Sequence, residues 1–79
     1  MSRPTVRAIA RARLLLNEQH SDAFKHDDRR LEICIDLCLT LAPHDPYIAT
    51  ELAAYECSHP ELVAALRLRR MGKTAGGSV

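Results

Sequence analysis

The sequence predicts an all-α fold, a small bundle of three to four short helices that forms a homodimer. No glycine precedes Gly72, so the chain has few sites for the positive φ angles that tight hairpin turns use. The prolines stand where helices are expected to begin or end. Apolar residues make up 47% of the chain and aromatic residues 4%, so the core is expected to be aliphatic.

The first two helices are expected over residues 4–18 and 24–42. The first begins at Pro4 and places four apolar residues on a face that can bury, namely Val6, Ile9, Ala12 and Leu16. Proline lacks the N–H that a helix interior needs, so the second helix is expected to end before Pro43.

The last two helices are expected over residues 46–57 and 60–71. Asp45 followed by Pro46 is typical of an N-cap with proline at the first helical position. The segment Ser58-His59-Pro60-Glu61 fits a capping box, in which Ser58 caps the last helix and Glu61 reaches back.

Residues 1–72 are expected to form a single helical domain, followed by a disordered tail over 73–79. Gly72 suits the position just after a final helical turn. The tail, Lys-Thr-Ala-Gly-Gly-Ser-Val, is short and rich in glycine. A domain of 79 residues gains no more than ~3–5 kcal/mol from its own core, which favours a homodimer as an extra source of stability.

Residues 31–41 fit two different structures. Every odd position is aliphatic, which is the period of a half-buried strand. On a helix, the same region leaves one polar line, formed by Arg29, Glu32, Asp36 and Thr40. The sequence has no second strand candidate, so a strand would have to pair with its copy in another subunit. A helix is therefore preferred. The alternative order, strand–helix–helix, resembles the ribbon–helix–helix architecture of dimeric DNA-binding proteins.

Charge is divided along the chain although the net charge is only +1. All ten acidic residues lie between Glu18 and Glu61, whereas eight of the eleven Lys and Arg residues lie outside this window. Such a division indicates where partners of opposite charge would bind.

The candidate partner-binding residues combine this charge with apolar anchors. Arg3, Arg7 and Arg11 are four residues apart, so they are expected to form one ridge of the first helix. The anchors are aliphatic residues and the two tyrosines, whose rigid rings are favoured at binding hot spots: Leu37, Leu41, Tyr47, Tyr55 and Leu66. More apolar residues are present than three short helices can cover, which indicates a surface for self-association or for a partner.

The predicted function is that of a small non-enzymatic regulatory or inhibitory protein that acts by protein–protein contact with a larger protein. Small proteins without catalytic motifs are often accessory products of mobile elements that target a host protein. The sequence contains no Gly-rich phosphate loop, nucleophile elbow or paired-carboxylate motif, so no catalytic residue and no cofactor is expected.

Residues 51–70 resemble a helix-turn-helix, the DNA-binding motif. In this interpretation Leu52 and Ala53 pack the first helix, and Val63 and Leu66 face inward from the second. Four basic residues could then contact nucleic-acid phosphates, namely Arg67, Arg69, Arg70 and Lys73. Cysteine replaces the usual turn glycine, and the start of the second helix has few side chains that read bases. A small dimeric DNA-binding transcriptional regulator is therefore the alternative function.

The three cysteines favour a reducing compartment and no metal site. Cys34, Cys38 and Cys57 cannot all pair with one another, and no Cys-x2-Cys knuckle is present for zinc. The N-terminal segment is interrupted by arginines, unlike a signal peptide, and no apolar run is long enough to span a membrane. These features predict a cytoplasmic protein that does not bind membranes.

Overall fold

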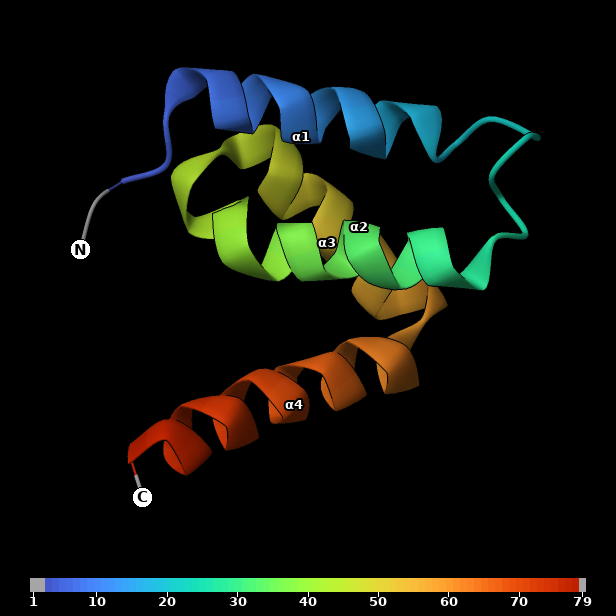
Figure 1. Cartoon of the computed structure of the whole chain (residues 1–79). Coiled ribbons are helices and arrows are strands. Elements are labelled where there is room, and N and C mark those ends of the chain that lie inside the picture. The colour runs from blue at the N-terminus through green and yellow to red at the C-terminus, as the bar shows by residue number, and fades with distance from the viewer. Residues whose placement is uncertain (1–2, 79) are drawn as a thin grey trace.

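The second and third α-helices each contact all the other helices and form the centre of the described chain (Figure 1). The computed structural model describes residues 3–78, and the side chains of residues 3–72. Within this range the chain forms four α-helices and one 3-10 turn: α1 (Val6–Glu18), α2 (Asp28–Leu41), η1 (Ala42–His44), α3 (Pro46–Ser58) and α4 (Pro60–Ser78). The predicted all-α bundle is confirmed.

The helices α1 and α4 lie on opposite sides of α2. α1 and α2 run antiparallel, α3 lies behind them, and α4 lies beyond α2 on the side away from α1 (Figure 1). α2 contacts each of the other three helices, whereas the described parts of α1 and α4 do not contact one another. The shortest dimension is 18 Å, about the thickness of two packed helices, so each helix keeps a face toward solvent.

The core forms around the inner face of α2. Cys34, Ile35 and Cys38 are almost completely buried there, together with Leu16 of α1 and Ile48 of α3. The polar line that the sequence predicts for this helix lies on its outer side. Ile33 is an exception to this division because it lies outside with 53% of its surface exposed.

The alternative of a strand over residues 31–41 is wrong. These residues belong to α2, and no strand occurs in the part of the chain that the structure describes. The neighbouring helices bury one face of α2, as a helix requires, whereas a strand would have left its backbone groups without a partner.

The expected start of α3 is confirmed. The Asp45 carboxylate accepts a hydrogen bond from the Ile48 N–H at 3.1 Å, and Pro46 occupies the first turn. The expected capping role of Ser58 is wrong. Ser58 ends α3, and its hydroxyl donates to the Ala54 carbonyl at 3.1 Å. The Ser58 hydroxyl thus bonds to a carbonyl of its own helix and does not cap α4. Serine near a helix end commonly forms such a local hydrogen bond.

Three helix bounds differ from the expected ones by two residues or more. α1 begins at Val6 because Thr5 caps it, its hydroxyl accepting from the Ala8 N–H at 3.0 Å. α2 begins at Asp28 rather than at residue 24, because the Asp27 carboxylate caps it in the same way.

α4 does not end at residue 71 but continues to Ser78. Gly72 has no positive φ, so it does not end the helix. A glycine inside a helix costs only about 1 kcal/mol, which does not by itself end a helix. The side chains of residues 73–79 lie outside the described part of the chain, and the disordered tail predicted there stays a prediction.

Candidate functional site

A groove of about 460 Å³ runs along the joint between α1 and the C-terminal half of α2. Thr5, Ala8, Ala12 and Leu15 line it from the α1 side, and Leu37, Thr40 and Leu41 line it from α2. The small alanine side chains face leucines across the joint, so the space between the helices is not filled. Arg7 and Arg11 also line the groove. The structure thus brings together four predicted partner-binding residues, namely Arg7, Arg11, Leu37 and Leu41.

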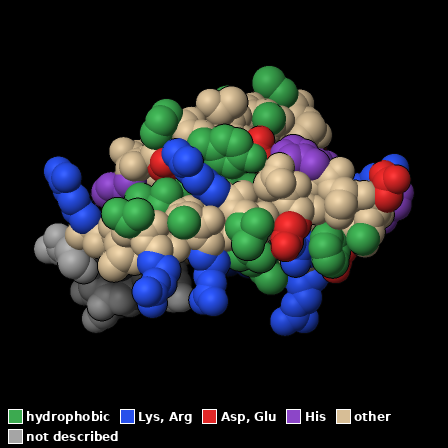
Figure 2. Space-filling model, turned by 90° about the horizontal axis from the view of Figure 1, so that it is seen from above, with side chains coloured by type: hydrophobic (Ala, Val, Ile, Leu, Met, Phe, Trp, Pro, Cys, Tyr) green, Lys and Arg blue, Asp and Glu red, His purple; other side chains and the backbone are tan. Residues whose placement is uncertain are grey.

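Arg7 and Arg11 carry charges that no described side chain neutralises. Both side chains are exposed, and among the described side chains neither has a hydrogen bond or an ion pair. One helical turn separates them, about 6 Å along the axis. Figure 2 views the molecule from the α1 side, where Lys and Arg side chains project from the surface beside hydrophobic ones. This face therefore combines available positive charge with an apolar groove.

The arginines of α4 are in the opposite situation. Arg67 pairs with Glu56 at 3.3 Å, and Arg69 lies 3.7 Å from the Glu32 carboxylate. Arg70 donates to Asp36 at 2.9 Å. These acidic residues belong to α2 and α3, so the acidic middle of the chain neutralises its C-terminal basic cluster.

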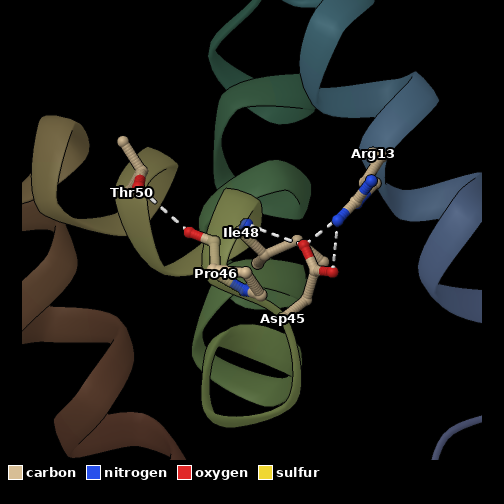
Figure 3. Close-up of polar contacts among 5 residues, drawn as sticks. All are labelled: Arg13, Asp45, Pro46, Ile48 and Thr50. Carbon is tan, nitrogen blue, oxygen red and sulfur yellow. Dashed lines mark hydrogen bonds and ion pairs between the residues drawn. The ribbon is translucent and has the colours of Figure 1, made fainter.

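Arg13 is the basic residue of α1 that pairs within the molecule (Figure 3). Its guanidinium donates to both carboxylate oxygens of Asp45, at 3.0 and 2.6 Å, and lies 5.6 Å from the centre of the Tyr47 ring. The hydrogen bond from Arg13, and a further one from the Ile48 N–H, hold the pKa of Asp45 below its usual range although burial opposes them. Arg13 therefore joins α1 to the start of α3.

The remaining predicted partner-binding residues lie away from the groove. Arg3 precedes α1, so helical spacing does not place it on a ridge with Arg7. Tyr47 is 36% exposed beside Arg13. Tyr55 and Leu66 are core residues with 8% and 3% of their surface exposed. Partner contact by these four residues stays a prediction, and for Tyr55 and Leu66 it would require the core to open.

A second groove, of about 670 Å³, lies between α2 and α4. Its lining includes Ile33 and the two ion pairs Arg69–Glu32 and Arg70–Asp36. Arg29 also lines it and has no ion pair among the described side chains. Opposite charges therefore meet along this groove, whereas the only charged residues that line the groove beside α1 are basic.

The region that resembles a helix-turn-helix has a short connection. His59 alone separates α3 from α4. Val63 and Leu66 are buried as expected, but Ala53 is exposed, so its expected packing role is wrong. Ala53 lies on the face of α3 that points toward solvent. Of the predicted phosphate contacts, Arg67, Arg69 and Arg70 are in ion pairs, and the Lys73 side chain lies outside the described residues.

The cysteines do not form a metal centre in the described part of the chain. No group of three or more His, Cys, Asp or Glu residues that could hold an ion occurs there. Cys34 and Cys38 are buried, and Cys57 is exposed. Burial raises the pKa of Cys38 to about 12, so its thiol stays protonated at neutral pH. Cys34 and Cys38 therefore act as small apolar core residues.

Comparison of the chain with protein-family models, with curated protein sequences and with solved structures finds no match. None of the helices in the described residues is both long and apolar enough to cross a membrane. The function of the chain is therefore inferred from its own residues.

On the α1 side of the groove, the sequence predicted Arg7 and Arg11 but not the apolar residues beside them. Val6 was expected to bury, yet it is 86% exposed because it lies in the first turn, beyond the end of the core. Ala8 and Leu15 line the groove instead. The spacing of Thr5, Ala8, Ala12 and Leu15 follows one side of a helix and could have indicated this surface.

Proposed function

We propose that this chain is a small non-enzymatic regulatory or inhibitory protein that acts by binding an acidic surface of a larger protein. The observation that supports this proposal is the unpaired charge of Arg7 and Arg11 beside an apolar groove. Electrostatic attraction would steer the partner to this face, and burial of the groove would hold it there.

The composition of the groove favours a protein partner over a nucleic acid. Apart from two threonines and two arginines, the groove is lined by alanine and leucine side chains, which offer no hydrogen bonds to phosphates and no aromatic ring on which a base could stack. The α4 arginines, which the DNA-binding alternative requires, already have carboxylate partners.

The homodimer forms a second part of the proposal. Leu68 and Met71 are each 68% exposed on α4, and Ala64 lies four residues before Leu68 on the same side of the helix. This stripe lies on the opposite side of α2 from the α1 groove. A dimer through α4 would therefore leave the groove free for the partner. Light scattering at micromolar concentration tests it, and a stable monomer would contradict it.

Affinity capture from the native host tests the main proposal. The tagged full-length chain is expected to retain a larger protein, and the double variant Arg7→Glu/Arg11→Glu is expected to lose it. Reversing two charges at the contact should lower the affinity by at least about a hundredfold, since each lost pair costs ~1.4 kcal/mol or more.

Lys25→Glu is the control because it reverses an exposed charge in the loop between α1 and α2, where Lys25 pairs with Asp22, which is itself exposed. This variant should keep the partner. If the captured material is nucleic acid, or if the arginine variant retains the partner as well as the native chain does, the proposal is wrong.

A further inference from the structure

The geometry of the α1–α2 groove also indicates which kind of structural element binds there. We propose that its occupant is an amphipathic helix of the partner protein, with an apolar stripe and, beside it, two carboxylates one helical turn apart. This inference rests on the proposed function and adds the chemistry of the partner to it.

The length of the groove suits about three turns of a helix. Its α1 side runs from Thr5 to Leu15, which corresponds to about 15 Å of helix axis. A helix laid along it would direct apolar side chains at positions i, i+3 or i+4, and i+7 against Leu37 and Leu41. Ala8 contributes only a methyl group to the groove surface, so the incoming backbone can approach α1 closely.

The two arginines fix which residues the partner helix needs. Arg7 and Arg11 are four residues apart on α1, and both border the groove. Carboxylates at positions i and i+4 of a helix parallel to α1 repeat the same spacing of about 6 Å. Each guanidinium can then donate two parallel hydrogen bonds to one carboxylate, the geometry in which arginine pairs most strongly.

A helix fits this site better than an extended strand. Side chains of two helices form the groove, and the described residues contain no strand edge to which an extended peptide could hydrogen-bond. A strand would bury its own N–H and C=O groups against Ala8, Leu37 and Leu41 without partners. A helix satisfies these groups internally and presents only side chains to the groove.

The test uses two designed peptides and two variants of the whole chain, in each of which one alanine is replaced by phenylalanine. One labelled peptide is a helix of 15–18 residues with a leucine stripe flanked by glutamates at i and i+4. The second has the same composition, with the glutamates moved to the opposite face. Ala8→Phe fills the groove, whereas Ala10→Phe places the same ring on an exposed position of α1 that does not line it.

Fluorescence anisotropy is expected to show binding of the first peptide to the native chain and to Ala10→Phe. The first peptide should bind Ala8→Phe with an affinity at least about tenfold lower than its affinity for the native chain. The second peptide should bind the native chain more weakly than the first peptide does, by about the same factor. Ala8 is exposed, so the chain is expected to remain folded, which circular dichroism checks. If Ala8→Phe fails to fold, Ala8→Asp replaces it, since a carboxylate there repels the acidic peptide.

The host partner separates failure of this inference from failure of the proposed function. If Arg7→Glu/Arg11→Glu loses the partner while Ala8→Phe keeps it, the groove inference is overturned and the proposed function stands. If neither variant loses the partner, both are overturned. A change in oligomeric state caused by Ala8→Phe alone would show that a second copy of the chain occupies the groove, which also overturns the inference.

Discussion

Arg7 and Arg11 on α1 and Arg69 and Arg70 on α4 are two arginine pairs in different electrostatic surroundings. The α4 pair lies against Glu32 and Asp36 of α2, whereas the α1 pair borders an apolar groove without a carboxylate partner among the described side chains. Both pairs would look alike in a count of charges. The difference teaches that equal charge does not mean equal availability: carboxylates of α2 neutralise the α4 pair, whereas the charge of the α1 pair remains available and is the basis of the binding role proposed for it.

The attachment of α4 to the core is the contact whose loss should have the largest effect. Leu66 is 3% exposed, so Leu66→Ala should lower the free energy of unfolding by about 2–5 kcal/mol through lost burial and the cavity left behind. Urea unfolding measures this change. Leu14→Ala is the control, because Leu14 is 59% exposed on α1 and should shift stability by no more than about 0.5 kcal/mol. Equal losses in the two variants would mean that α4 does not pack through Leu66.

The Arg13–Asp45 pair should give the next largest effect, and it depends on pH. The pKa of Asp45 is lowered in the fold, so its stabilising effect is complete above its unfolded value of about 4. That effect is lost as pH falls through the lower folded pKa. Asp45→Asn should therefore be less stable than the native chain at pH 7.

The difference in stability between Asp45→Asn and the native chain should shrink on acidification, because the native chain then loses the Arg13–Asp45 interaction as well. Thermal melts between pH 7 and pH 2.5 measure it. Asp22→Asn is the control, since the Asp22 side chain is 94% exposed and its removal should leave the acid dependence unchanged. A constant difference between Asp45→Asn and the native chain across this range would contradict the role assigned to the pair.

The ion pairs between α2 and α4 should have the smallest effect on stability. Both are solvent-exposed, so Glu32→Gln/Asp36→Asn should change the free energy of unfolding by only ~0–1 kcal/mol for each pair. The same variant should bind more strongly to heparin, because Arg69 and Arg70 lose the carboxylates that neutralise them. Unchanged retention on heparin would show that these arginines were not neutralised in the native chain.

Features that depend on neighbouring residues were predictable from the sequence. Asp45 followed by Pro46 indicates the start of α3, and the structure places the Asp45 carboxylate on the Ile48 N–H. Ser58 shows the limit of such local patterns. Its hydroxyl can either donate to the Ala54 carbonyl in the preceding turn or cap the next helix, and the local sequence does not decide between these two hydrogen bonds.

Features that depend on distant residues were not predictable. Arg70 and Asp36 are 34 residues apart, and nothing in the sequence indicates that they meet while Arg7 stays unpaired. The i, i+4 spacing of Arg7 and Arg11 did indicate a shared ridge, but the groove beside it depends on how α1 packs on α2. Pairing and groove both follow from tertiary packing, which a periodic pattern does not specify.

Retention on a heparin column compares the two arginine pairs most directly. Arg7→Gln/Arg11→Gln and Arg69→Gln/Arg70→Gln remove the same formal charge from the chain. If the α1 pair provides the available positive charge, the first variant should elute at clearly lower salt than the native chain, and the second close to it. Equal shifts for both variants, or a larger shift for the α4 variant, would contradict the difference in available charge between the two arginine pairs.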